Sequence, residues 1–197
     1  MNRARLALIA PLAAISLSAC GVNSIPTAEE EAKARWADVQ NQYQRRADLI
    51  PNLVATVKGY AKQESDVLTR VTEARAQANS IRLSGDDLRD PAKVQQFAAA
   101  QNRVTMALGA IRPLQEAYPD LKSNANFLAL QSQLEGTENR ITIARADYNK
   151  AVQAYNTRIR TFPDAIGAKL IYGAKPMATY KAATPGADVA PSLEGKI

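Results

Sequence analysis

Apolar residues recur every three or four positions through three long stretches of this sequence. A repeat near 3.6 residues places one apolar stripe along a helix, and that stripe must pack against neighbouring helices. No window shows the sustained alternation of apolar and polar residues that is typical of a half-buried strand. Only short links separate the three stretches, which favours antiparallel neighbours. The sequence therefore predicts an all-α fold, an up-and-down antiparallel helical bundle of three to four long helices.

The first predicted helix begins at Thr27, because Thr27 and Glu30 have the spacing of a capping box. Pro51 lies inside this stretch, and proline removes one helical hydrogen bond and disfavours helix for the residue before it. The stretch is therefore either one kinked helix of about 50 residues or two helices with a break near Asp48. The apolar stripe keeps its phase across Pro51, which favours the kinked helix.

The second predicted helix follows a loop over Ser80–Asp90, which contains a Ser-Gly-Asp-Asp run typical of turns. Asp90 followed by Pro91 is a typical helix start, since Asp caps the helix and Pro suits its first position. Helical spacing then continues toward Tyr118. We expect one helix of about 27 residues here.

The third predicted helix follows Pro119, with Asp120 placed to cap it, and ends before Phe162. A short further helix is predicted over Asp164–Leu170. Three glycines lie inside the predicted helices, where each costs about 1 kcal/mol relative to alanine. Close approach of neighbouring helices is the expected compensation at these positions, Gly59, Gly109 and Gly136.

The N-terminus has the three parts of a secretory signal: Arg3 and Arg5, the apolar run Leu6–Leu17, and small residues before Cys20. This run is shorter than the roughly 20 residues that cross a bilayer. The tetrad Leu17-Ser18-Ala19-Cys20 resembles the lipobox of bacterial lipoproteins, in which the Cys is acylated and the peptide is cut before it. Two or more acyl chains anchor stably. The sequence thus predicts a membrane-anchored lipoprotein, held by lipid at Cys20.

The position after this Cys is Gly21 rather than Asp, which favours the outer membrane, facing the periplasm. We expect four segments: a cleaved lipoprotein signal peptide over 1–19, a lipid-attached tether over 20–26, a helical bundle domain over 27–172, and a flexible tail over 173–197. The tail is predicted to be flexible because it carries several prolines and shows little periodicity.

Composition excludes several classes of function. The chain has no histidine, which rules out a Ser-His-Asp triad and a His-ligated metal or haem site. Its one Cys is assigned to lipid, and no glycine-rich phosphate loop occurs. The formal net charge of +6 falls when Arg3 and Arg5 leave with the leader. We expect no nucleic-acid partner, no metal, no cofactor and no catalytic residues.

Carboxylates do not form a catalytic pattern either. Asp86 and Asp87 lie in the predicted loop, and Glu29, Glu30 and Glu31 begin a helix, where acids are favoured by the helix dipole. General acid–base chemistry is therefore not expected from these side chains.

One dense polar patch stands out beside Pro51. An arginine pair there could bind a carboxylate or phosphate, or could pair with acids on a neighbouring helix while Asp48 caps or pairs at the break; the second, structural interpretation is simpler. If the first and third helices are neighbours, the patch forms a polar layer that fixes their register. Replacing Glu138 with Ala should then lower the unfolding midpoint markedly, and an unchanged midpoint would count against a buried layer. The candidate patch comprises Arg45, Arg46, Asp48, Glu138, Asn139, Arg140, Arg145 and Asn149.

Several ordered motifs resemble the LemA family. The two longest read Arg-Arg-Ala-Asp-Leu-Ile-Pro-Asn-Leu and Tyr-Pro-Asp-Leu-Lys, and the resemblance covers roughly Glu29–Leu170. The segments that carry it are Arg45–Val54, Val57–Ala61, Tyr118–Lys122, Asn126–Phe127, Glu138–Ile141 and Tyr148–Asn149.

The resemblance implies a helical bundle in the bacterial cell envelope and no established biochemical activity. Members typically enter the membrane by an N-terminal hydrophobic helix, whereas this chain has a lipobox at Cys20. We therefore expect a non-enzymatic scaffold or adaptor for an envelope protein partner. The alternative is a structural or membrane-remodelling protein acting on the bilayer surface.

Overall fold

The computed structural model of the chain describes residues 23–181. The predicted signal peptide, Cys20 and residues 182–197 lie outside this part. All regular elements of the described part are helical. In chain order they are α2 Ser24–Tyr60, α3 Ser65–Ser80, η1 Asp87–Arg89, α4 Pro91–Gly109, α5 Arg112–Ala117, α6 Pro119–Lys122, α7 Ala125–Arg158, α8 Asp164–Gly167 and η2 Ala168–Tyr172.

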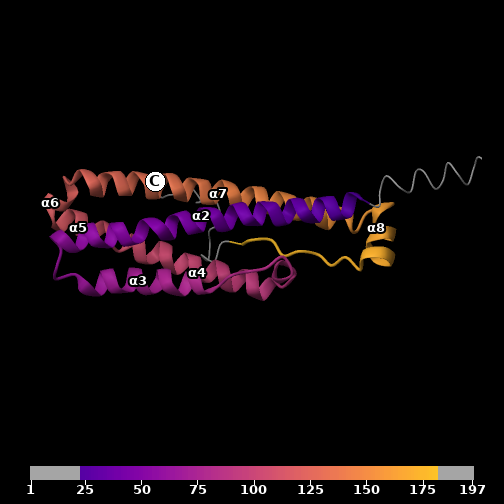
Figure 1. Cartoon of the computed structure of the whole chain (residues 1–197), viewed down its shortest axis with the longest axis horizontal. Helices are drawn as coiled ribbons and strands as arrows, with labels where there is room; N and C mark the ends of the chain where they lie inside the picture. The colour runs from indigo at the N-terminus through magenta and orange to yellow at the C-terminus, as the bar shows by residue number, and fades with distance from the viewer. Residues whose placement is uncertain (1–22, 182–197) are drawn as a thin grey trace, which may run out of the picture.

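Figure 1 shows an elongated bundle of antiparallel helices. The two long helices α2 and α7 run side by side along its whole length. The shorter pair α3 and α4 covers the half of the bundle that holds the end of α2, where α5 and α6 make the turn into α7. At the other end, α8 and η2 lie beside the start of α2. The predicted all-α bundle is confirmed.

The apolar stripes close into two cores. The first surrounds Trp36, whose indole packs with ring centroids 5.2 Å from Phe97 and 5.1 Å from Tyr148. The second lies toward the α5–α6 end and includes Ile50, with 1% of its surface exposed, and Phe127, with 2%. A fully buried side chain of this size contributes about 1.5–3 kcal/mol. Burial of side chains in these two cores therefore supplies most of the stability of the fold.

Helix α2 is continuous through Pro51, as the unbroken apolar phase predicts. The expected length of the helix is wrong, because α2 ends at Tyr60 and α3 starts only at Ser65. A single longer helix would leave the apolar side chains of α3, such as Val71, without a partner. The chain instead folds back, and Val71 becomes fully buried.

The predicted start of this helix is also wrong. Helix α2 begins at Ser24, one turn earlier, and the hydroxyl of Thr27 donates to the carbonyl of Asn23 at 2.8 Å, a bond made inside a helix. Pro26 fits the first turn, where no amide partner is required. Burial of Ile25, 1% exposed, stabilises the additional turn.

The predicted second helix has the expected start but not the expected length. The side chain of Asp90 accepts from the amide of Ala92 at 2.9 Å, so the predicted cap is confirmed. The helix ends at Gly109 rather than near Tyr118. Pro113, which has no amide hydrogen to donate, lies in the first turn of the separate helix α5.

The third long helix starts at a different cap from the predicted one. Asp120 lies inside the short helix α6, and Asn124 caps α7 by accepting from the amide of Phe127 at 2.9 Å. Helix α7 then runs unbroken to Arg158. The predicted short helix near Asp164 is present as α8, followed by one π-helical turn.

The glycines inside the predicted helices do not mark close helix approach. A Cβ atom added at Gly59, Gly109 or Gly136 would meet no heavy atom of a neighbouring segment within 4 Å. That prediction is wrong, because these positions face open space.

The prediction of a flexible tail from residue 173 is wrong for residues 173–181, which we call the C-terminal strap. Gly173 has φ +54, so the chain can reverse after η2 and run back along the bundle (Figure 1). Met177 and Tyr180 are 4% and 5% exposed and join the first core. The strap thus covers a part of α2 and α7 that α3 and α4 leave open.

Candidate functional site

The polar layer is centred on Arg46, which lies between the two cores and is 2% exposed. Its Nη1 donates to Oε1 of Glu138 on α7 at 2.8 Å and to Oγ1 of Thr105 on α4 at 2.9 Å. Its Nη2 donates to the backbone oxygen and the side-chain Oε1 of Gln101, at 3.0 and 2.7 Å. One guanidinium therefore links three helices, and its charge is balanced by an acid on α7.

The ion pair is asymmetric in exposure. The side chain of Glu138 is 41% exposed, whereas Arg46 is buried. Water still hydrates the carboxylate, so most of the cost of this layer lies in desolvating the arginine, which the hydrogen bonds to Gln101 and Thr105 offset. Such a layer fixes helix register because a shift of one helix would leave the guanidinium unsatisfied.

A second pair of residues extends the layer to the strap. The guanidinium of Arg145 lies 4.4 Å from the ring centroid of Tyr180, a cation–π contact. The hydroxyls of Tyr43 and Tyr180 share a hydrogen bond of 2.6 Å. Burial raises the pKa of both phenols above the ordinary value of 10, because an ionised phenolate would be poorly solvated here.

Two Tyr-Asn pairs on α7, seven residues apart, hold the strap. The side-chain amide of Asn149 donates to the backbone carbonyl of Tyr180 and accepts from its backbone N–H. The side-chain amide of Asn156 makes the same two hydrogen bonds with Met177, and all four distances are 2.7–2.9 Å. The hydroxyls of Tyr148 and Tyr155 donate to backbone carbonyls of the strap at 2.8 and 3.0 Å. Seven helical residues and three extended residues both span about 10 Å, so the two spacings match.

Asn149 is one of the predicted site residues, but the strap contacts Tyr148, Tyr155 and Asn156 were not predicted from the sequence. The repeated Tyr-Asn dipeptide at heptad spacing is the signal that could have identified them.

The polar layer leaves little room for a ligand. The cavity between Arg46, Glu138, Arg145 and Tyr180 has a volume of about 60 Å³, whereas small-molecule sites are typically about 300 Å³ or larger. The predicted residues that meet here are Arg46, Glu138, Arg145 and, through the strap, Asn149. The geometry of these residues is suited to packing the helices together and fixing their register rather than to binding a ligand.

The other four predicted residues do not join the layer. Arg45, Asp48, Asn139 and Arg140 are exposed. Asp48 accepts from Nε2 of Gln44 at 2.7 Å, a bond within one helix, and so neither caps a break nor pairs with an arginine. These four side chains are presented to solvent on α2 and α7.

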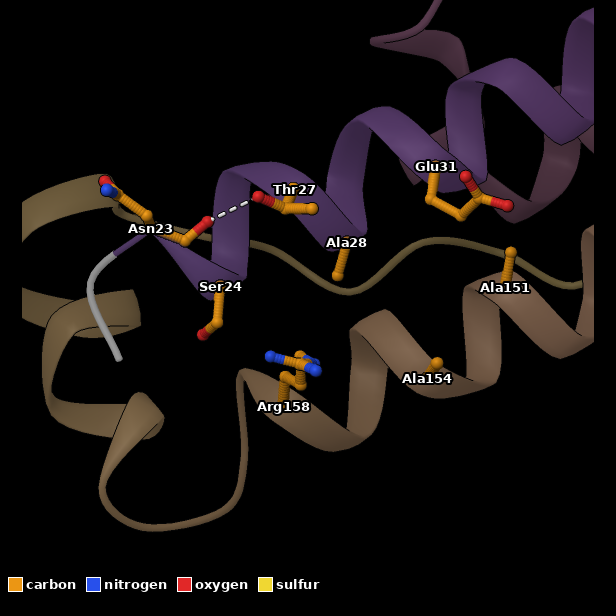
Figure 2. Close-up of a pocket in the computed structure, with 8 residues that line it drawn as sticks. All are labelled: Asn23, Ser24, Thr27, Ala28, Glu31, Ala151, Ala154 and Arg158. Atoms are coloured by element: carbon orange, nitrogen blue, oxygen red, sulfur yellow. Dashed lines mark hydrogen bonds between the residues drawn. The ribbon is translucent and has the colours of Figure 1, made fainter. Parts of the chain in front are cut away.

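A groove at the α8 end was also missed. Figure 2 shows it between the first turns of α2 and the last turns of α7, with Ser24 and Arg158 extending into the gap. Its volume is about 500 Å³. Small side chains keep it open, and the lining residues are Asn23, Ser24, Thr27, Ala28, Glu31, Ala151, Ala154 and Arg158.

Across residues 23–181, no three acidic or Cys side chains come together in a way that could hold a metal ion. Within the same residues, none of the helices combines the length and apolarity needed to cross a membrane.

Comparison with known proteins places the chain in a family. The model of the LemA family matches residues 35–194, which include the strap. Magnetosome protein MamQ 2 of Paramagnetospirillum magneticum is 24% identical over 157 residues, 72% of this chain and 58% of that protein. Protein LemA of Metamycoplasma hominis is 22% identical over 140 residues, 71% of this chain and 60% of that protein.

Magnetosome protein MamQ of Magnetospirillum gryphiswaldense is 23% identical over 157 residues, 72% of this chain and 58% of that protein. The chain thus spans less than two thirds of the length of these curated relatives. The family match covers most of the chain, and the helical bundle agrees with the fold that the sequence motifs imply. The chain belongs to the LemA family.

Proposed function

We propose that this chain is a lipoprotein of the bacterial cell envelope, anchored through acylated Cys20, whose bundle acts as a non-enzymatic scaffold or adaptor for other envelope proteins. The location proposed is the outer membrane, facing the periplasm. The relatives named as magnetosome proteins support a role at a bacterial membrane structure.

The observation that carries the proposal is the closeness of the lipobox to a rigid helix. Cys20 precedes Ser24, the first residue of α2, by four positions. Four extended residues reach at most about 14 Å. Helix α2 has 37 residues and is about 55 Å long. An acylated Cys20 would therefore hold one end of a long bundle close to the bilayer.

The adaptor role is supported by polar side chains that the fold does not use. Arg45 on α2 and Asn139 and Arg140 on α7 flank the Arg46 layer but are exposed. Arginine is enriched in protein interfaces and among the residues that contribute most to binding. We propose that these side chains contact the envelope partner.

Proximity labelling in the native bacterium tests the adaptor role. The full chain carrying a labelling enzyme at its C-terminus is compared with a variant in which Arg45→Glu and Arg140→Glu reverse two exposed charges. The control reverses one charge on α3, Arg70→Glu. We expect a defined set of envelope proteins to be labelled by the parent and the control and lost in the double variant. Equal labelling by all three forms would contradict the adaptor surface.

Fractionation tests the anchor separately. A form in which an ordinary cleavable secretion signal replaces residues 1–20 should be recovered as soluble periplasmic protein after a high-salt wash, while the parent stays with the outer membrane. Membrane retention of the released form after that wash, or a soluble parent, would contradict anchoring at Cys20.

A further inference from the structure

Exposed apolar side chains gather at one end of the bundle. Nine large hydrophobic residues are exposed among those that the structure describes, and five of them lie within Phe162–Tyr172. Large exposed apolar patches on a soluble surface mark sites of interaction with protein or membrane. We call Phe162–Tyr172 the end segment; its exposed residues are Phe162 82%, Ile166 54%, Leu170 78%, Ile171 62% and Tyr172 40%.

The end segment is fixed to the start of α2. The hydroxyl of Ser24 donates to Asp164 at 2.7 Å, and Asp164 also lies 3.7 Å from Arg158. Ala168 is 2% exposed, and Gly167 lies against Ile25, where an added Cβ would be 3.8 Å from the Ile25 Cδ1. The apolar side chains are therefore held beside the helix that follows Cys20 (Figure 1).

Charge around the end segment is predominantly positive. Arg160, Lys169 and Lys175 are exposed, and the acid among them, Asp164, is paired with Arg158. Basic residues next to apolar ones are the composition of surfaces that lie on anionic bilayers.

The nearest acids do not oppose this arrangement. Glu29 pairs with Lys33 and Arg89, Glu30 with Lys33, and Glu31 with Arg35.

We infer that the end segment is a membrane-contact surface, which inserts its apolar side chains at the interface of an anionic bilayer while its Arg and Lys side chains bind lipid phosphates. The inference deepens the proposed function and rests on it in one respect: acylated Cys20 supplies the second attachment. A lipid alone would leave the bundle free to pivot, whereas two attachments set its axis relative to the membrane and carry the α5–α6 end tens of ångströms away.

Tryptophan quenching tests the contact. The lipidated full chain is reconstituted into vesicles of phosphatidylethanolamine and phosphatidylglycerol with brominated acyl chains, which quench indoles that enter the bilayer. One variant carries Phe162→Trp, and the matched control carries Leu128→Trp, an exposed position (48%) near the start of α7 at the opposite end. Trp36, 3% exposed, gives the same background in both.

We expect at least twofold quenching of the new indole in Phe162→Trp and almost none in Leu128→Trp. Absence of quenching at position 162, or equal quenching at both positions, would overturn the inference.

A second measurement tests the membrane contact in the absence of the lipid anchor at Cys20. The mature chain released by an ordinary secretion signal is sedimented with the same lipids without bromine. We expect weak binding that high salt abolishes and that Leu170→Glu with Ile171→Glu reduces at least fivefold, while Ile143→Glu on α7 leaves it unchanged. This result stands even if Cys20 carries no lipid, so failure of the anchor and failure of the contact are distinguishable.

The competing occupant is a second copy of the chain. Analytical ultracentrifugation of the released form should show a monomer with or without the two glutamates. A concentration-dependent dimer that Leu170→Glu with Ile171→Glu dissolves would assign the surface to self-association and overturn the membrane contact.

Discussion

Arg46 and Arg45 are adjacent in sequence and opposite in environment. Arg46 is 2% exposed and makes four hydrogen bonds to α4 and α7, whereas Arg45 is exposed. Successive helical residues point about 100° apart, so only one member of the pair can face the core. The sequence predicts a polar layer involving the pair, but only packing decides which arginine enters it.

Replacing Arg46 with Ala should lower the free energy of unfolding by about 3 kcal/mol, because Gln101 is left unsatisfied and a cavity opens between the cores. Glu138→Ala should also be markedly destabilising, by about 2 kcal/mol, because the buried guanidinium of Arg46 loses its counter-charge, although the carboxylate itself is 41% exposed. The control Arg45→Ala should change stability by less than about 0.5 kcal/mol. Urea denaturation followed by circular dichroism measures all three. Equal losses at positions 45 and 46 would show that the layer does not hold the helices.

Tyr43 and Tyr180 make stability depend on alkaline pH. Burial raises the folded pKa of each phenol above 10, whereas the unfolded phenols ionise near 10. The unfolded state therefore binds fewer protons above pH 10, and stability present below that pH falls as pH rises further. Tyr43→Phe removes one such group. We expect its stability to fall less steeply than that of the parent between about pH 9.5 and 11.5. Parallel curves for the variant and the parent would refute this origin of the pH dependence.

The C-terminal strap is held on the bundle mainly through hydrogen bonds to its backbone. Its contacts with α7 are made mostly to backbone groups, so its own side chains carry little of the pattern that identifies a helix or strand. Helices and strands can be recognised in a sequence by the regular spacing of their apolar residues, and the strap shows no such spacing. For this reason the sequence predicts a flexible tail where the structure has an ordered segment.

Asn149→Ala and Asn156→Ala together should release the strap. The amides of Tyr180 and Met177 would lose their acceptors, and their hydrogen exchange should accelerate more than tenfold, because opening of the strap no longer breaks these bonds. Asn139→Ala, an exposed amide on the same helix, is the control and should leave exchange unchanged. Hydrogen exchange is measured by mass spectrometry on peptides that cover residues 173–181. Unaltered protection in the double variant would mean that apolar packing alone holds the strap.

Two glycines should respond to alanine in opposite directions. Gly136 lies inside α7 with open space where a Cβ atom would be added, so Gly136→Ala should raise the unfolding free energy by about 0.5–1 kcal/mol. Gly173 has φ +54, which L residues rarely adopt, so Gly173→Ala should lower it by about 1 kcal/mol. Thermal unfolding compares the two variants. A gain at Gly173 or a loss at Gly136 would contradict these roles of the backbone.

The long helices were the most predictable part of the fold, because their apolar residues recur clearly every three or four positions. This spacing continues through Pro51 in α2 without a change of phase. The breaks were less predictable. The stripe retains its phase from α2 into α3 even though the chain reverses after Tyr60, and the apolar spacing around Pro113 hides the break there. Of the candidate patch, the sequence identified Arg46 and Glu138 but not Gln101 or Thr105, whose roles depend on how α4 crosses the layer.

At the scale of the whole molecule, the proposed protein is a bundle held by one end. The groove of Figure 2, the end segment and the start of α2 all lie at that end, and the polar surface around Arg45 and Arg140 lies farther along the bundle. This arrangement suits a protein that reaches from a membrane toward a partner. Lipid attached at Cys20 is the central requirement of such an arrangement.

Intact mass spectrometry of the full chain, extracted with detergent from membranes of the native bacterium, tests that requirement most directly. We predict a chain that begins at Cys20 and carries the added mass of a diacylglyceryl group and an amide-linked acyl chain. A chain that still begins at Met1, or a product with an unmodified thiol at position 20, would contradict it.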